Sequence, residues 1–533
     1  MINILYYAWN KLNDEMTIEA FKSHEENNVT VFERKITDYH ADSAFGEALI
    51  RILHEKSIDV VFSYNYFPII SMICEINHIP YISWLYDCPL TTTFSKTITN
   101  ECNYVFNFDR LSAQRLDFLG CAHSIHYPLS GSDFLIRSAE NSSHCKEYDD
   151  YKSDITFVGG LYNGTKNAYR NAEFDEFTKG YLDGIISAQK KVYGYNFIYD
   201  SLNDDIVSKV VSDCKLELSD MYTFDAKRLA SDVLGREVTA RERIEALGIL
   251  ARIAPVDLYT QSELPDDLKK ENIRLHSTVS YSGQMPLIFK KSRINLNITS
   301  KTIESGVPLR IFDILSCGGF CLTNYQPEVA ELFEDGVDLV MYTSMKDMAV
   351  KAAYYLEHEK EREQIALNGQ RRVLNDYNLS DCVSGMLDIV FPKDAATEAS
   401  NKDADCSTDD LYAKIERMIS ERKIDEMSEF LYAMDKELVW NNDLSTLYFL
   451  IGIYKIEKKN GVIGIFDRGL KINEIVRRHD KLRRFVRKLE WWDEYTKDEL
   501  IQFMLTEGVS AYELQWAVDT TAVYPEKIWR KLR

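Results

Sequence analysis

The sequence predicts an α/β protein with two parallel-sheet domains, a helical insertion in the second domain, and an all-helical domain at the C-terminus. Three observations support this fold class. Strand and helix signals alternate along residues 1–137, and that order favours parallel strands. The same order restarts after the polar segment 138–154, which we interpret as an interdomain linker. Residues 410–533 carry only helical patterns.

The first domain, residues 1–137, is expected to be Rossmann-like because it begins with an apolar strand. Its predicted strands are 2–7, 29–32, 60–63, 81–85 and 104–108. Its predicted helices are 43–56, 67–77 and 111–119. No glycine-rich dinucleotide fingerprint follows the first strand, which argues against a dehydrogenase.

Asp87 follows the predicted strand 81–85 directly, at the kind of position where open α/β sheets bind their ligands. It is our candidate for an acid-base or acceptor-binding residue. The alternative from the residues alone is a turn-forming aspartate close to a proline. Asp109 closes a later strand in the same way and ranks lower. We expect His123 and His126, three residues apart, to be structural, because metal binding would need an acidic third ligand.

The second domain, residues 155–391, is also expected to be Rossmann-like. Its first strand leads into Gly159 and Gly160, followed by Tyr162, and a glycine turn lets the backbone approach a phosphate or a sugar. Residues 166–252 carry consecutive helical patterns and predict a helical insertion. The other predicted strands are 256–260, 275–281, 294–298 and 339–342, and the closing helices are 346–358 and 361–374.

A polar loop with Ser305 and Gly306 follows the strand 294–298 and precedes a predicted helix, 308–317. The N-terminus of such a helix has unpaired N–H groups and a partial positive charge, which suits a phosphate. Arg310 would add a bidentate cation, and Asp313 could accept hydrogen bonds from a ribose diol. From the spacing alone, an ordinary i,i+3 surface ion pair between Arg310 and Asp313 is an equal alternative.

Several segments together resemble a known family. They are VPLRIFDILSCGGFCLTNY, ELFEDGVDLVMY and YYLEHEKEREQIALNGQRRV, with INLNITSKTIESG upstream and WLYDCP near residue 87. Residues 1–390 resemble the spore-maturation-type (CgeB-like) bacterial glycosyltransferases. The resemblance implies the GT-B fold, in which two Rossmann-like domains face each other across a cleft, and it implies that Asp87 faces this cleft. Related retaining enzymes carry two glutamates eight residues apart, where this chain has Ser305 and Asp313, so the stereochemical outcome stays open.

The leading hypothesis is a glycosyltransferase of the hexosyltransferase type. It would transfer a sugar from a nucleoside-diphosphate donor to a protein or surface-glycan acceptor, with Asp87 as the catalytic residue. The expected donor-binding residues are Gly159, Gly160, Tyr162, Ser305, Gly306, Arg310 and Asp313. We expect no metal, since the donor half has no Asp-x-Asp motif at a strand end, and no cofactor besides the nucleotide sugar. The alternatives are a nucleotide-sugar epimerase on the same fold and a non-catalytic scaffold that acts through its C-terminal helices.

Charge and composition limit the partners. The 533 residues carry a net charge of −21 and have a pI near 5.1, which argues against nucleic acid because phosphate binding needs a basic face. The first residues, MINILYYAWN, lack a basic signal region, and no window approaches eighteen apolar residues. Ten scattered cysteines suit a reducing compartment. We therefore expect a cytoplasmic protein.

The C-terminal third begins with residues 392–409, which have almost no large apolar side chains and predict a flexible tether. Residues 410–533 predict a helical, tetratricopeptide-like module, although no clean 34-residue period is present. Within it, 472–492 combines an apolar stripe with basic flanks and two tryptophans. A packed helix with a solvated charged face is the favoured interpretation, and weak contact with an anionic membrane surface or another protein is the alternative.

Overall fold

The computed structural model describes residues 2–9, 13–24, 27–132, 134–135, 137, 151–216, 221–223 and 226–392. The chain divides into two compact units, Met1–Lys393 and Asp394–Arg533, and all described residues belong to the first. The expected module at 410–533 with its segment 472–492, nearly all of the tether 392–409, and most of the linker 138–154 lie outside the described residues.

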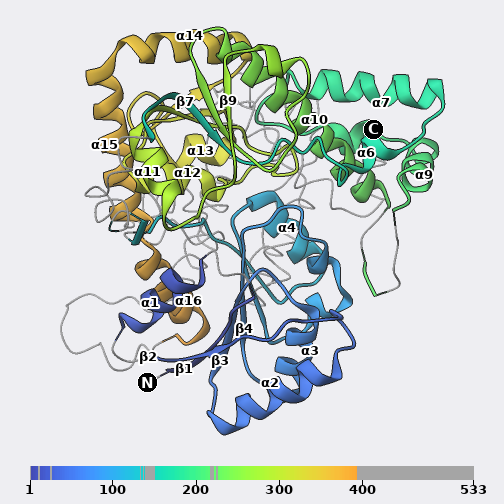
Figure 1. Ribbon diagram of the computed structural model, residues 1–533. Helices are drawn as coiled ribbons and strands as arrows, with labels where there is room; N and C mark the ends of the chain where they lie inside the picture. Colours follow the sequence, from blue (N-terminus) through green and yellow to red (C-terminus); the bar gives the residue numbers. More distant parts are fainter. Residues whose placement is uncertain are drawn as a thin grey trace, which may run out of the picture. The chain divides into compact units, whose positions relative to one another are not determined.

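The first half of the described unit is built on a parallel sheet with the strand order β2-β1-β3-β4-β5-β6 (Figure 1). Its strands are β1 (Ile2–Tyr7), β2 (Asn27–Phe32), β3 (Val60–Tyr64), β4 (Tyr81–Leu85), β5 (Asn103–Asn107) and β6 (His123–His126). Its helices are α1 (Asp14–Lys22), α2 (Ser43–Glu55), α3 (Pro68–Asn77) and α4 (Arg110–Phe118), with the short 3-10 helices Thr91–Phe94 and Lys96–Thr99.

The second half contains another parallel sheet, in the order β12-β11-β10-β7-β8-β9. Its strands are β7 (Ser153–Val158), β8 (Val256–Tyr259), β9 (Ile273–His276), β10 (Ser292–Asn297), β11 (Cys321–Asn324) and β12 (Val340–Tyr342). Its helices are α6 (Ala168–Asn171), α7 (Glu176–Gln189), α8 (Ile198–Ser201), α9 (Asp204–Asp213), α10 (Ala226–Ala251), α11 (Gln284–Lys291), α12 (Leu309–Ser316), α13 (Pro327–Leu332), α14 (Met345–Glu357), α15 (Glu359–Asp376) and α16 (Leu379–Val390), with a 3-10 turn at Leu268–Lys270.

The predicted α/β class with two parallel sheets is confirmed, because the described part of the chain contains two six-stranded parallel sheets. One predicted strand has clearly different bounds in the structure. The expected strand 275–281 is β9, Ile273–His276, which pairs with β8 alone at the edge of the sheet. Since β8 has only four residues, the ladder ends at His276 and the following residues leave the sheet.

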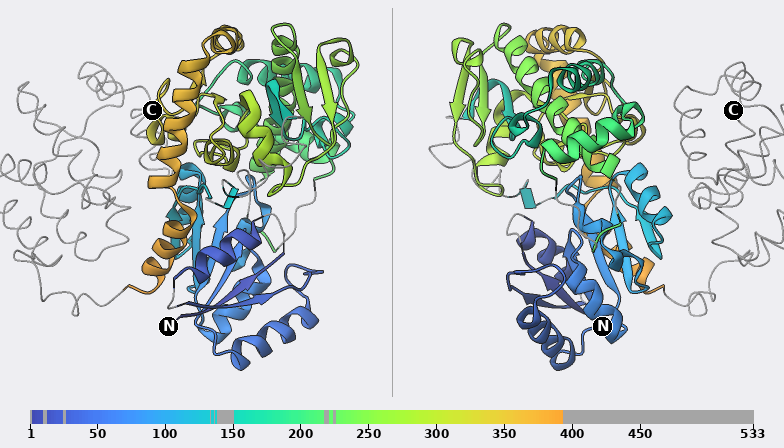
Figure 2. Two further views of the ribbon diagram at one scale, coloured as in Figure 1. Left: turned by 60° about the vertical axis from the view of Figure 1, so that its left-hand side comes forward. Right: turned by 90° about the vertical axis from the view of Figure 1, so that its right-hand side faces the viewer.

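Two helices that the sequence did not predict, α1 and α16, join the two halves. Figure 2 shows α15 running from the second sheet toward the first, where α16 packs against α1. At that contact the hydroxyls of Ser23 and Ser380 lie 3.0 Å apart. One buried cluster includes Ile4 from the first half and Ile311 and Met386 from the second, so the halves share a hydrophobic core.

The helices between β7 and β8 contribute side chains to two hydrophobic cores. Early residues of α10, such as Leu234 and Val238, pack with α7, α8 and α9 in a separate helical cluster. Later residues, such as Leu247 and Leu250, pack against the second sheet. The long helix α10 therefore fixes this helical layer to the second sheet. Among the described helices, none has a stretch long and apolar enough to cross a membrane.

Candidate functional site

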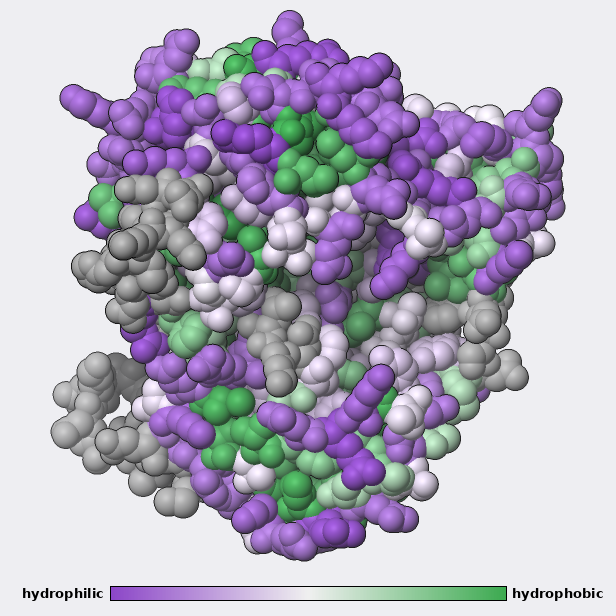
Figure 3. All heavy atoms as spheres, in the orientation of Figure 1, coloured by the Kyte–Doolittle hydropathy of each residue, from purple (hydrophilic) through white to green (hydrophobic). Residues whose placement is uncertain are grey.

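The order of the second sheet reverses between β7 and β10, and open α/β sheets bind ligands in the crevice at such a point. The chain leaves β7 into Gly159 and Gly160, and it leaves β10 into Ile298. Arg243 of α10 connects the two strand ends, because its Nη1 donates to the Gly160 carbonyl at 2.5 Å and its Nη2 to the Ile298 carbonyl at 2.7 Å. In the space-filling view the surface is hollowed between the two halves (Figure 3).

Arg243 is a buried cation that makes no direct ion pair in the described part of the chain, although the charge of Glu242 acts on it. It is 8% exposed, its Nε lacks a hydrogen-bond partner there, and its guanidinium lies over the Tyr162 ring at 4.6 Å. Burial lowers the pKa of this arginine. A buried charge without a counter-ion is costly, so an anion bound here would be stabilised.

Arg310 lies in the first turn of α12, which begins directly after Pro308. Its Nη1 donates to Asp313 Oδ2 at 2.9 Å. Asp313 is 3% exposed and also accepts the Tyr281 hydroxyl, and burial raises the pKa of Asp313 to about 6 although Arg310 opposes this. The i,i+3 ion pair is therefore present, but the Asp313 carboxylate is buried. The carboxylate orients the Arg310 guanidinium, which remains partly open to solvent. The charge of Arg310 acts to lower the pKa of Arg243, and Arg310 lies on α12, the next helix after β10.

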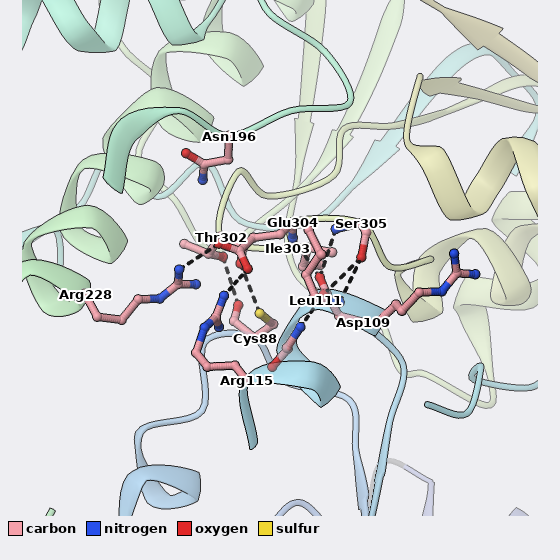
Figure 4. A network of polar contacts seen from close by, with 12 residues as sticks. Cys88, Asp109, Leu111, Arg115, Asn196, Arg228, Thr302, Ile303, Glu304 and Ser305 are labelled. Carbon is pink, nitrogen blue, oxygen red and sulfur yellow. Dashed lines mark hydrogen bonds and ion pairs between the residues drawn. The ribbon is translucent and has the colours of Figure 1, made fainter. Parts of the chain in front are cut away.

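Ser305 and Gly306 contact the first half of the unit. Backbone N–H groups of Glu304, Ser305 and Gly306 donate to one carboxylate oxygen of Asp109, at 2.7, 3.1 and 3.3 Å (Figure 4). Asp109 is 1% exposed and its other oxygen accepts the Ser112 N–H at the start of α4. The loop and the N-terminus of α4 thus share one buried carboxylate, and in this structure these N–H groups bind protein.

Glu304 extends the same network. Arg115 of α4, from the first half, and Arg228 of α10, from the second half, both reach its carboxylate (Figure 4). Burial would raise the pKa of Glu304, but the two guanidiniums outweigh burial and lower it to about 2. Asp109 differs, because burial raises its pKa and the nearby Glu328 and Glu304 carboxylates raise it further.

Asp87 follows β4 and is open to solvent. Its Oδ2 accepts a hydrogen bond from the Asn65 side-chain amide at 2.8 Å. Desolvation of the carboxylate by the surrounding protein raises its pKa. Arg236 of α10 is near enough to lower the pKa partly. Arg236 and Arg243 are seven residues apart on the same face of this helix, a rise of about 10 Å. Arg236, whose charge acts on Asp87, and Arg243 therefore lie along one side of α10.

Comparison with known proteins agrees with this geometry. Residues 239–388, which include Arg243 and Arg310, match the model of a family described as glycosyl transferase-like. This segment is a glycosyl transferase-like domain. No curated protein matches the chain.

Solved structures were also compared. Anabaena Alr3699/HepE in complex with UDP and glucose is 10% identical, covers 73% of this chain and 99% of its own, and gives a TM-score of 0.42. Sucrose-phosphate synthase from Thermosynechococcus elongatus is 8% identical, covers 73% of this chain and 98% of its own, and gives a TM-score of 0.43. A glycosyltransferase from Rickettsia africae is 11% identical, covers 73% of this chain and 97% of its own, and gives a TM-score of 0.40.

Of the expected donor-binding residues, Gly160 and Tyr162 contact Arg243, and Gly159 precedes Gly160 in the chain. Arg310 and Asp313 pair with each other on α12. The structure places Ser305 and Gly306 at Asp109, and Asp87 at the end of the first sheet.

Sequence reasoning missed Arg243, at the start of the glycosyl transferase-like domain. The signal that could have found it is a row of polar or small residues on α10 at spacings of three and four. This row runs beside the segment from Ile298 to Glu304. Its members are Arg228, Asp232, Gly235, Thr239 and Arg243.

The two histidines have structural contacts, since His123 stacks on Tyr104 and His126 lies 2.7 Å from the Glu328 carboxylate. Within the described ranges, no group of three or more His, Cys, Asp or Glu side chains could hold a metal ion.

Proposed function

We propose that this protein is a metal-independent glycosyltransferase that moves a hexosyl group from a nucleoside-diphosphate donor to an acceptor hydroxyl. The observation that carries the proposal is the pair of guanidiniums, Arg243 and Arg310, at the switch point of the second sheet. A diphosphate carries at least two negative charges and several acceptor oxygens, which two planar, permanently charged forks can bind together. Gly159 and Gly160 leave room for a phosphate beside them.

The reaction follows from the positions of the charges. An acceptor oxygen attacks the anomeric carbon of the donor, the bond from that carbon to the diphosphate oxygen breaks, and the acceptor proton passes to Asp87. Negative charge builds on the leaving diphosphate, where Arg310, Arg243 and the N-terminus of α12 offset it. The spacing of about 10 Å between Arg236 and Arg243 along α10 leaves room for one sugar ring between the diphosphate and Asp87.

The loop with Ser305 and Gly306 is not free to bind a donor in this structure. Its N–H groups can bind a donor only after the Asp109 carboxylate has moved away, because all three now donate to that carboxylate. Asp313 remains a candidate for the ribose, although both of its oxygens already accept one hydrogen bond. We therefore place the main donor affinity on the two arginines.

Substitution of Arg310 tests the proposal. Arg310→Ala should weaken UDP binding by about 2–4 kcal/mol, the cost of truncating one partner of a buried charge pair, and should weaken UMP binding much less. Arg310→Lys should restore part of the loss, because an ammonium lacks the fixed fork. Calorimetric titration of each variant with UDP, ADP, GDP and the monophosphates gives these affinities.

Arg252→Ala is the matched control. Arg252 lies just after α10, is largely exposed and pairs with Glu271 on the surface, so its removal should leave all affinities within about twofold. Equal diphosphate affinity for wild type and Arg310→Ala would remove the donor site.

The same measurements also distinguish the proposed transferase from the two alternatives that the sequence allows, a scaffold and an epimerase. A scaffold would bind none of the nucleotides. An epimerase would bind them and convert a nucleotide sugar without any acceptor, so product analysis with the donor alone distinguishes it from a transferase.

A further inference from the structure

The first sheet also has a switch point, between β1 and β3, and an aromatic side chain lies across it. Trp9 follows β1, and its indole N–H donates to the carbonyl of Tyr64, the last residue of β3, at 2.7 Å. This hydrogen bond ties the indole ring to the ends of both strands. The ring nevertheless remains 38% exposed. It is thus a fixed aromatic surface at the place where open α/β sheets bind ligands.

Three more rings continue this surface. The Tyr86 ring lies nearly parallel to the indole, with the ring centres 6.3 Å apart, and Phe67 meets the indole edge to face at 5.6 Å. Tyr39 packs against Phe67 at 6.0 Å and is 45% exposed. Phe67 itself is buried, at 6% exposed, and joins the partly exposed side chains of Trp9, Tyr39 and Tyr86. We call Trp9, Tyr39, Phe67 and Tyr86 the aromatic patch. Exposed aromatic side chains that gather at a strand-end crevice mark a ligand site more often than a plain surface.

Polar groups border the aromatic patch on the side of Asp87. Asp87 follows Tyr86 in the chain, and its carboxylate accepts the amide of Asn65, which is 2% exposed. The side-chain carbonyl of Asn65 accepts the backbone N–H groups of Tyr86 and Asp87, at 3.2 and 3.3 Å. Asn65 therefore fixes the carboxylate and the neighbouring ring in one orientation. Asp38 adds a second carboxylate next to Tyr39 in the chain.

A saccharide matches this combination best. A pyranose ring has an apolar C–H face that packs on an aromatic ring, and hydroxyls at its rim that donate to carboxylates. The Asp87 carboxylate disfavours an anionic group directly beside it. An extended peptide would bind by backbone hydrogen bonds along a free strand edge, whereas the aromatic patch lies at strand ends.

We propose that the aromatic patch binds a neutral saccharide acceptor, with one sugar ring stacked on Trp9 and a hydroxyl directed at Asp87. This inference rests on the proposed glycosyltransferase function and names the class of its acceptor. It places Trp9 and Tyr39 as binding residues in the first half of the unit, away from the arginines that hold the donor.

The test uses the full chain and a panel of neutral methyl hexosides, N-acetylhexosaminides and disaccharides, observed by saturation-transfer NMR. We expect at least one of these saccharides to bind to wild type. Trp9→Ala and Tyr39→Ala should each weaken it at least tenfold, and Trp9→Phe, which keeps an aromatic face, should weaken it less. UDP affinity, measured by calorimetry, should stay within twofold in all three variants.

Phe118→Ala is the control for the loss of an exposed ring. Phe118 ends α4 in the same half and is 60% exposed, so saccharide binding should be unchanged. The inference is overturned if no saccharide of the panel binds, or if Trp9→Ala, Tyr39→Ala and Phe118→Ala behave alike. Tyr39→Ala decides the matter if Trp9→Ala fails to fold. Saccharide binding without UDP binding would instead refute the proposed function and leave the aromatic patch in place.

Discussion

Arg243 and Arg310 differ in how their charges are balanced, and this difference decides which of the two is better suited to mutation. Arg310 has the buried Asp313 as its partner, whereas the contacts of Arg243 in the described residues are backbone carbonyls and a tyrosine ring. Removal of Arg243 would also break the link between the ends of β7 and β10. Arg310 is therefore the cleaner probe of anion binding, provided that the state of Asp313 is known.

The pH dependence of stability reports that state. Burial raises the pKa of Asp313 from 3.8 to about 6 in the folded protein. Because the folded pKa exceeds the unfolded one, the proton stabilises the fold at low pH, and this contribution disappears as the pH rises through 6. Wild type should lose about 1 kcal/mol more unfolding free energy between pH 5 and pH 7 than Asp313→Asn does.

Denaturant unfolding of both proteins at the two pH values measures this difference. The other buried acids with raised pKa values, such as Asp109 and Asp232, are common to both proteins and cancel in the comparison. Parallel pH profiles would show that Asp313 is ionised throughout, as in an ordinary ion pair.

At the scale of single elements, the contact between α4 and the loop before α12 depends on one glycine. A Cβ on Gly306 would lie 2.7 Å from the Phe108 carbonyl oxygen and 2.8 Å from Asp109 Cα. Gly306→Ala should therefore push the two elements apart and lower the unfolding free energy by about 1–3 kcal/mol. Amide exchange of Arg110 and Leu111 should become faster, since their N–H groups donate to Glu328 and Ser305 across this contact.

Gly164→Ala is the control for that experiment, because a Cβ at Gly164 would meet nothing within 4 Å. Its stability should be unchanged or slightly higher, through a smaller loss of backbone entropy on folding. If the two variants melt alike, the two elements do not approach each other this closely in solution.

The elements also show what the sequence can reveal. Strand ends such as Asp87 and Gly159 could be predicted as site positions, because the carboxyl ends of parallel strands share one edge of a sheet. Arg243 could not be found in this way, since an arginine in a long charged helix is usually expected to face solvent. The partners of Asp109 could not be predicted either, because they lie 195 to 197 residues away in the chain. The same holds for α16, whose packing on α1 no local pattern indicates.

At the scale of the whole molecule, several contacts connect the two halves of the described unit, and three of them are extensive. These are the polar network around Asp109 and Glu304, the return of α16 to α1, and the hydrophobic core that includes side chains of both halves. A nucleotide donor at the arginine crevice and an acceptor at the aromatic patch would both lie within this unit. Donor binding and transfer chemistry should therefore need nothing beyond it.

Truncation tests that conclusion. The first compact unit ends at Lys393, and the sequence of 392–409 lacks the large apolar side chains that could anchor it to a core. Residues 1–391 alone should thus melt in one cooperative transition, and their UDP affinity should stay within twofold of the full chain. Affinity for a large acceptor could still fall, because a tethered module raises the effective concentration of whatever it binds. Scanning calorimetry and UDP titration of both chains give the answer. An insoluble truncated chain, or one with a broad melting transition, would show that 410–533 completes the fold. Loss of UDP binding in a truncated chain that still melts cooperatively would place part of the donor pocket in that module.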